Sequence, residues 1–140
     1  MEYTLSIIKP DAMKRGLQND ILKMITTDGG LTIVLQKNIQ LTIEQARKFY
    51  DVHKERPFYD QLCNSMIECP VSVQILSGED AIKKYRKLMG ATNPAQSEEG
   101  TIRKKFGISI DENSVHGSDA PETAEYEILT LFSIKELIEA

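Results

Sequence analysis

The sequence contains no tryptophan, and only two cysteines and two histidines occur among its 140 residues. The cysteines are Cys63 and Cys69, and the histidines are His53 and His116. Their positions do not match the Cys and His spacing of zinc sites, and two thiols are too few for the disulfide framework of a small secreted domain. We therefore expect two reduced, partly buried thiols that behave as small apolar side chains.

Long apolar runs are also missing. No stretch approaches the roughly 20 residues that a membrane-spanning helix needs. The first ten residues have no basic segment before an apolar core, which a secretory signal would require. The sequence therefore predicts neither a membrane partner nor secretion, and the cytoplasm is the expected compartment.

Neither sign of charge dominates the chain. Lys and Arg number 17 against 21 Asp and Glu, so the formal net charge is −4, and the strongly basic footprint of a nucleic-acid-binding protein is absent. The balance of 41% hydrophobic and 27% charged residues is ordinary for a globular chain, and the length suits a single domain over residues 1–140. Any site for a polyphosphate must carry its positive charge locally.

The glycine-rich motifs that bind phosphate through backbone amides are absent. The sequence has no Gly-x-x-x-x-Gly-Lys-Ser/Thr and no Gly-x-Gly-x-x-Gly, and it lacks protein-kinase motifs and the Gly-x-Ser-x-Gly element. A phosphoryl-transfer enzyme built on this chain would therefore have to hold phosphate with side chains.

Hydrophobic periodicity and turn residues predict alternating strands and helices. A period of two over 71–76 predicts a half-buried strand, and capping boxes that begin at Thr42 and Ser133 predict helix starts. Ser77 is expected to cap the helix over 79–89. The predicted strands are 3–8, 31–41, 71–76 and one that ends at 114–116. The predicted helices are 18–27, 42–52, 58–67, 79–89 and 101–106, followed by one that begins at 121 and a short one after 133. This order favours an α+β fold of ferredoxin-like topology, in which helices cover a four-stranded antiparallel sheet.

Positively charged side chains that would suit a triphosphate are scattered along the chain. Lys9 ends the first predicted strand, Arg86 lies on a later helix, and Arg103 follows a long loop over 90–100 that contains Thr92. Long loops in compact domains are commonly functional, and a guanidinium group binds phosphate oxygens as a fork. Each cation alone is most often a solvated surface charge, and the spacing does not show that the three meet.

His116 stands in the run Asn113-Ser114-Val115-His116-Gly117-Ser118-Asp119. A single histidine is most often a structural or surface residue. A neutral imidazole can also act as a nucleophile and form a covalent intermediate. In that case we expect Gly117 to leave room for a phosphoryl group beside the ring, and Ser118 and Glu127 to orient the imidazole.

These features together resemble the nucleoside diphosphate kinase family. The run around His116 is similar to the family's signature at its phosphohistidine. Other segments similar to the family's pattern are Ile8-Lys9-Pro10-Asp11, Arg15-Gly16-Leu17, Arg56-Pro57-Phe58-Tyr59, Gly90-Ala91-Thr92-Asn93-Pro94-Ala95 and Gly100-Thr101-Ile102-Arg103. The resemblance extends along nearly the whole chain.

The resemblance implies ping-pong transfer of a γ-phosphate from a nucleoside triphosphate to a nucleoside diphosphate, through a phosphohistidine on His116 Nδ1. Glu127 and Ser118 would orient the ring, and Lys9 would take part in catalysis. The implied nucleotide-binding residues are Lys9, Tyr50, Phe58, Leu62, Arg86, Thr92, Arg103, Ile110 and Asn113. Stacking on Phe58 would accept any base, because every base has a π-face, so the resemblance implies broad base specificity and a role in maintaining (d)NTP pools.

The resemblance also implies Mg2+ as a cofactor, held by nucleotide phosphates with few or no direct protein ligands. ATP and other nucleoside tri- and diphosphates would be the substrates, and the protein would be a homo-oligomer, either a hexamer or a tetramer. No nucleic acid is required. The turn at Asp28-Gly29-Gly30 is one residue longer than the family's pattern, and Glu98 and Glu99 place two acids near the expected phosphate path. The end at Ala140, without a longer tail, favours a bacterial-type short form.

Two other interpretations stay open at this point. A phosphohistidine carrier would receive phosphate from a protein at His116, but it would not need Phe58 or the three cations. A ferredoxin-like module that senses nucleotides without catalysis could dispense with His116 and Glu127, yet both are present.

Overall fold

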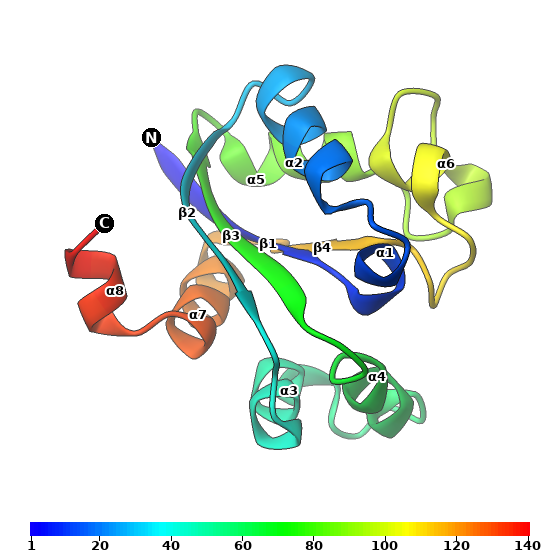
Figure 1. Ribbon diagram of the computed structural model, residues 1–140, viewed down its shortest axis with the longest axis vertical. Coiled ribbons are helices and arrows are strands. Elements are labelled where there is room, and N and C mark those ends of the chain that lie inside the picture. Colours follow the sequence, from blue (N-terminus) through cyan, green and yellow to red (C-terminus); the bar gives the residue numbers. More distant parts are fainter.

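The computed structural model describes all 140 residues. Its centre is one four-stranded sheet in the order β2-β3-β1-β4, and every neighbouring pair of strands is antiparallel. The strands are β1 (Glu2–Ile8), β2 (Thr32–Ile39), β3 (Val71–Gly78) and β4 (Val115–Gly117). With helices on both faces of this sheet (Figure 1), the predicted ferredoxin-like α+β fold is confirmed.

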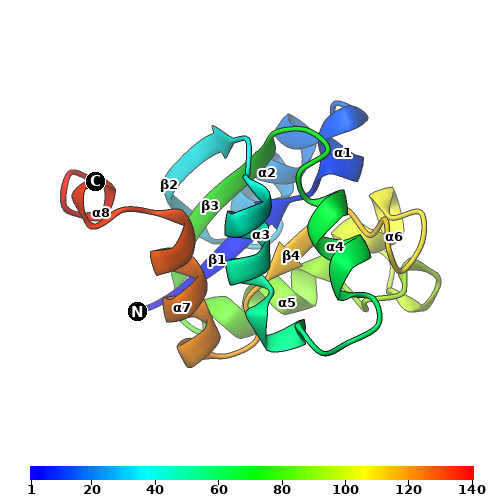
Figure 2. The same ribbon diagram turned by 90° about the horizontal axis from the view of Figure 1, so that it is seen from below.

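The helices divide between the two faces of the sheet. One face is covered by α1 (Pro10–Lys14), α2 (Gln18–Thr27), α5 (Ala81–Met89) and α6 (Ile102–Phe106). The other is covered by α3 (Ile43–Phe49), α4 (Tyr59–Ser65) and α7 (Pro121–Leu131). Short helices η1 (Asp51–His53) and η2 (Pro94–Gln96) lie in connections, and α8 (Ile134–Ile138) follows α7. In Figures 1 and 2, α8 is set off from the other helices at the C-terminal end.

Side-chain alternation along the central strands builds a separate core on each face. In β1, Leu5 and Ile7 belong to the core under α3, α4 and α7, whereas Ile8 belongs to the core under α2 and α5. Ser6 also faces α5, where its hydroxyl lies 2.6 Å from the Tyr85 hydroxyl. The two-residue period of a strand therefore decides which helices each side chain meets.

Both predicted capping boxes are confirmed. At α3, Thr42 Oγ1 accepts the Gln45 N–H at 3.1 Å, and Gln45 Oε1 accepts the Thr42 N–H at 2.9 Å. Ser133 and Glu136 make the same reciprocal pair at α8. Each box satisfies two backbone donors that the first helical turn leaves without partners.

Two local predictions are corrected. Ser77 does not cap α5, because it lies within β3 and pairs with Tyr3 and Thr32. The helix begins instead after Asp80, and the Glu2 carboxylate accepts the Ile82 N–H at 2.9 Å. Helix α1 was not predicted from the sequence.

Both cysteines are free thiols, as predicted, with Cys63 buried and Cys69 partly exposed. No helix in the structure is long and apolar enough to cross a bilayer.

Candidate active site

His116 lies in the middle of the short strand β4, opposite Ile7 of β1. Its ring packs edge-on against Phe49 at 5.0 Å and Tyr50 at 6.3 Å between ring centroids. About a quarter of the side chain is exposed, at 23%. The imidazole is therefore fixed by aromatic neighbours and still accessible to a ligand.

The Glu127 carboxylate of α7 contacts both the imidazole and the Ser118 hydroxyl. One oxygen, Oε1, lies 3.0 Å from His116 Nε2 and accepts the Ser118 hydroxyl at 2.6 Å. Ser118 Oγ accepts the Leu5 N–H of β1 at 3.3 Å, which ties this group to the sheet. A carboxylate that accepts at this contact favours the tautomer with the proton on Nε2 and the lone pair on Nδ1.

Lys9 and Asn113 form the second part of the site. Lys9 Nζ donates to Asn113 Oδ1 at 3.1 Å and to the Asp111 carbonyl at 3.4 Å. Asn113 Nδ2 donates to the Thr92 carbonyl at 3.1 Å, so the long loop is joined to β4, while the Thr92 side chain is exposed. Burial lowers the pKa of Lys9, because the ammonium loses hydration, and Asp11 partly offsets this effect.

Arg103 of α6 is a second buried cation. Its guanidinium donates to the Gly90 carbonyl at 3.1 Å and to the Val115 carbonyl at 2.9 Å, next to His116 in the chain. The Nε donor is buried without a partner, and burial lowers the pKa of Arg103. An unpartnered buried N–H is unfavourable, so the surroundings of Arg103 do not fully satisfy its donors.

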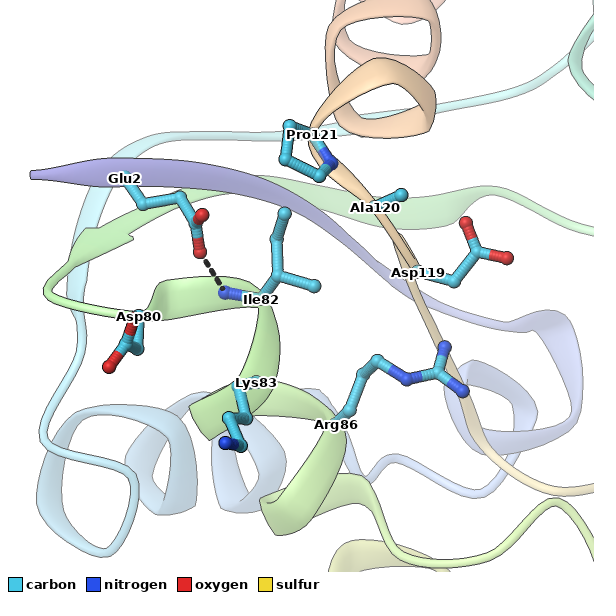
Figure 3. A pocket seen from close by; sticks show the side chains of 8 residues that line it. All are labelled: Glu2, Asp80, Ile82, Lys83, Arg86, Asp119, Ala120 and Pro121. Carbon is cyan, nitrogen blue, oxygen red and sulfur yellow. Dashed lines mark hydrogen bonds between the residues drawn. The ribbon is translucent and has the colours of Figure 1, made fainter.

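Arg86 lies at the rim rather than inside. Its side chain is exposed on α5 and contributes to a cleft of about 380 Å³ lined by Glu2, Asp80, Ile82, Lys83, Arg86, Asp119, Ala120 and Pro121. Figure 3 shows its guanidinium extending from α5 toward Asp119. The repulsion of Arg86 also contributes to the lowered pKa of Arg103, so the two positive charges act on each other.

The residues predicted to contact the base are placed at the surface or near it. Phe58 is 45% exposed and Ile110 is 55% exposed, whereas Leu62 is partly buried against the core that contains Tyr50. Tyr50 itself is buried, and burial raises its pKa. Large exposed apolar side chains such as Phe58 can stack on a planar ligand.

Gly117 does not have the predicted function of making room beside the histidine ring. It points to the opposite face of the sheet, where an added Cβ would lie 2.8 Å from both Tyr85 and Met89 of α5. The glycine is required for close packing of α5 on β4, because neighbouring strand residues point to opposite faces.

Sequence reasoning missed three residues of this region. Phe49 contacts the His116 ring, His53 lies 5.6 Å from Phe58 between ring centroids, and Asp11 accepts a hydrogen bond from the Ser114 N–H at 3.1 Å. Asp11 lies in a segment similar to the family's pattern, so a signal existed there. For Phe49 and His53 the sequence offered none, because a single aromatic residue in or just after a helix is usually a core residue.

The chain matches the sequence model of the family described as nucleoside diphosphate kinase over residues 2–137. It is 58% identical over 138 residues to the nucleoside diphosphate kinase of Jannaschia sp. (strain CCS1), covering 99% of this chain and 98% of that protein. The corresponding enzyme of Nitratidesulfovibrio vulgaris (strain DP4) is 54% identical, with 99% of each chain covered.

Solved structures agree with the sequence comparison. The Aquifex aeolicus nucleoside diphosphate kinase superimposes with a TM-score of 0.93 at 41% identity, covering 96% of this chain and 97% of that one. A halophilic nucleoside diphosphate kinase from Halobacterium salinarum, determined in complex with CDP, gives a TM-score of 0.91 at 36% identity, covering 96% and 90%. The chain therefore belongs to the nucleoside diphosphate kinase family of phosphotransferases, which transfer phosphate between nucleoside tri- and diphosphates.

Proposed function

We propose that this chain transfers γ-phosphate by a ping-pong mechanism in which His116 is the phosphorylated intermediate. The observation that carries the proposal is the contact between Glu127 and His116 Nε2 at 3.0 Å. Because that contact occupies Nε2, the lone pair of Nδ1 is available for attack on phosphorus. A histidine with both nitrogens engaged by protein groups would not support this role.

In the first half-reaction, His116 Nδ1 forms a bond to the γ-phosphorus, and the bond from that phosphorus to the β,γ-bridging oxygen breaks. The nucleoside diphosphate leaves with the electron pair of that bond. Nε2 keeps its proton, and the Glu127 carboxylate stabilises the positive charge that develops on the ring. The second half-reaction is the reverse, with a different diphosphate as acceptor.

The cationic residues would hold and neutralise the phosphates. Phosphoryl transfer depends mainly on positioning and charge stabilisation. Lys9 and Arg103 bring desolvated positive charge close to β4, which supports their role in neutralising phosphate. Arg86 would contact phosphate from the rim. Tyr50, Thr92 and Asn113 would complete the phosphate and ribose contacts.

Base binding would involve Phe58, with Ile110 opposite and Leu62 nearby. The exposure of Phe58 and Ile110 supports this assignment, because a stacking surface must be open to its ligand. Stacking does not distinguish among bases, so we propose broad specificity and a role in maintaining (d)NTP pools.

Magnesium would enter with the nucleotide. The structure contains no group of three His, Cys, Asp or Glu side chains suited to hold a metal ion. Mg2+ commonly keeps several waters and binds substrate phosphates, and the donors of this site, Lys9 and Arg103, suit phosphates that are shared with a metal. The ion would supply neutralisation of phosphate charge.

We also propose a cytoplasmic homo-oligomer, tetramer or hexamer, in which residues 1–140 form one kinase domain. The unpaired edge of β2 and an apolar groove of about 640 Å³ between the sheet and α7 and α8 support self-association. Val34 and Leu129 line this groove and are 40% and 52% exposed. The free thiols suit a reducing compartment. Light scattering coupled to size exclusion would measure the oligomer.

The decisive experiment labels the protein with [γ-32P]ATP and Mg2+ and then adds excess GDP. We expect acid-labile label on the protein that leaves as GTP. His116→Ala should take no label, whereas His53→Ala, which removes the only other histidine, should still take it. Label that remains on His116→Ala would overturn the mechanism.

The same assay separates the alternatives. A phosphohistidine carrier takes its phosphate from a protein and would not be labelled by ATP, and a nucleotide-sensing module would bind ATP without any label, so only the kinase gives label that leaves as GTP. Arg103→Ala should still be labelled on His116, only more slowly. An unchanged labelling rate would count against the role of Arg103.

A further inference from the structure

The turn that leads into β4 has an unusual backbone conformation. Ser114 is fully buried and has a φ of 75°, and the Val115 N–H donates to the Asn113 carbonyl at 2.9 Å. A hydrogen bond between residues two apart, around a central residue with positive φ, closes a γ-turn of the rare and strained form. Such strain persists only where surrounding contacts enforce it.

The contacts that enforce this turn come from the end of β1 and the start of α1. Asp11 Oδ2 accepts the Ser114 N–H at 3.1 Å, and the Lys9 N–H donates to the Ser114 carbonyl at 2.9 Å. The Ser114 hydroxyl is buried and has no hydrogen-bond partner, so its own side chain does not hold the conformation. Asp11 makes the one side-chain hydrogen bond to the Ser114 backbone.

The turn lies between the two halves of the site. On one side of it is Asn113, whose amide accepts from Lys9 Nζ at 3.1 Å. On the other side is Val115, whose carbonyl accepts from Arg103 at 2.9 Å, and then His116. A rotation at Ser114 would therefore move His116 relative to Lys9 and Asn113.

We propose that Asp11 is a positioning residue, which holds the Ser114 turn so that His116 keeps its geometry relative to Lys9 and Asn113. This inference rests on the proposed function of His116. Burial raises the pKa of Asp11, while the charge of Lys9 and the Ser114 N–H oppose that rise. The carboxylate is thus held in a partly desolvated position, where it accepts the Ser114 N–H.

A double-mutant cycle tests the proposal. Glycine adopts positive φ without a steric penalty, so Ser114→Gly should make the Asp11 contact dispensable. We expect Asp11→Ala to slow single-turnover labelling of His116 at saturating ATP by about ten- to a hundredfold, the size of effect that a small misplacement produces. In the Ser114→Gly background, Asp11→Ala should slow labelling much less. Asp11→Asn keeps an acceptor oxygen, so it should retain most of the wild-type labelling rate.

Asp20→Ala is the matched control, because Asp20 is an exposed acid in the first turn of α2, as Asp11 is in the first turn of α1. It should label at the wild-type rate. Circular dichroism and thermal unfolding verify that each variant is folded. If Asp11→Ala alone fails to fold, the comparison of Ser114→Gly with the double variant decides: equal rates support the proposal, and a tenfold slower double variant overturns it.

The failures of the two proposals are distinguishable. A wild-type protein without acid-labile label on His116 overturns the proposed function and the role of Asp11 with it. If the wild type is labelled on His116 but Asp11→Ala is labelled at the same rate, only the positioning role is overturned. The same holds if Asp11→Ala slows labelling equally in the wild-type and Ser114→Gly backgrounds. Equal losses would mean that Asp11 acts on α1 rather than through Ser114.

Discussion

Replacing Glu127 with Gln tests how the carboxylate contributes to catalysis. Glu127 and His116 are only 12% and 23% exposed, so solvent screens their interaction weakly. A hydrogen bond to a charged group contributes about 1.5–3 kcal/mol, against about 0.5–1.5 kcal/mol for a neutral one. Glu127→Gln should therefore lose about 1–1.5 kcal/mol of stabilisation as positive charge develops on the ring, which corresponds to a rate lowered about tenfold. Glu127→Ala, which removes the acceptor, should slow the step by about ten- to a hundredfold.

Quenched-flow labelling of His116 at saturating ATP measures this step without the contribution of binding. Glu125→Gln is the control, because Glu125 is exposed on the same helix. Nitrogen-15 NMR of the imidazole gives an independent readout, since the proton should reside on Nε2 in the wild type and redistribute in Glu127→Ala. With two histidines in the chain, His53→Ala provides the assignment.

Two results would refute this account of Glu127. The first is a wild-type labelling rate in folded Glu127→Gln and Glu127→Ala, which would show that the carboxylate does not stabilise charge on the ring. The second is a neutral wild-type imidazole whose proton resides on Nδ1. That tautomer would leave Nδ1 without a lone pair, and the lone pair of Nε2 would face Glu127 instead of the phosphate.

Two further predictions concern packing and charge. Gly117→Ala should lower the free energy of unfolding by about 1–3 kcal/mol in thermal or urea unfolding, because the new methyl group would lie 2.8 Å from Tyr85 and Met89. Gly78→Ala should lower the free energy of unfolding less, since its Cβ would meet only the flexible end of one leucine. Equal destabilisation by the two substitutions would contradict the packing argument. Burial lowers the pKa of Lys9 below the 10.5 of an ordinary lysine, and a bound phosphate favours the charged form, so ADP affinity measured by calorimetry should fall as pH rises toward that value. Lys9→Met should lack this pH dependence, and the same profile in both proteins would refute the role of Lys9.

Local sequence signals were sufficient for most of the fold. The capping boxes at Thr42 and Ser133 marked true helix starts because they act within four residues. Alternation over 71–76 marked β3, although that strand is buried on both faces. Its polar positions are Ser72 and Gln74, which bond to each other at 2.6 Å beneath the helices. The alternation was therefore a sign of a polar layer inside the protein rather than of a solvent-exposed face.

The elements that were missed are either very short or depend on distant contacts. Helix α1 has five residues, too few for a periodic pattern, and it forms where Pro10 follows the extended Lys9. The start of α5 is set by Glu2, which is 80 positions away in the sequence from Ile82. No local pattern contains that information.

In the site, too, local patterns could be identified from the sequence and contacts between distant residues could not. The run around His116 could be identified from the sequence, but the contact of Lys9 with Asn113 joins residues 104 positions apart. Only the resemblance to a family suggested this convergence. Gly117 was misassigned because a small residue next to a reactive one suggests space for the ligand, whereas strand alternation directs it to the other face.

The chain as a whole is negatively charged, whereas Lys9 and Arg103 place positive charge in the site. The net charge is −4, yet Lys9 and Arg103 are buried and form no ion pair with a carboxylate. Their hydrogen-bond partners are neutral carbonyl and amide oxygens. Such partners satisfy donors without cancelling charge, so an incoming phosphate need not displace a carboxylate. Burying these cations without a counter-ion costs free energy in the empty fold, and a bound phosphate supplies the missing counter-ion, so nucleotide should stabilise this protein against unfolding by an amount that grows with nucleotide concentration.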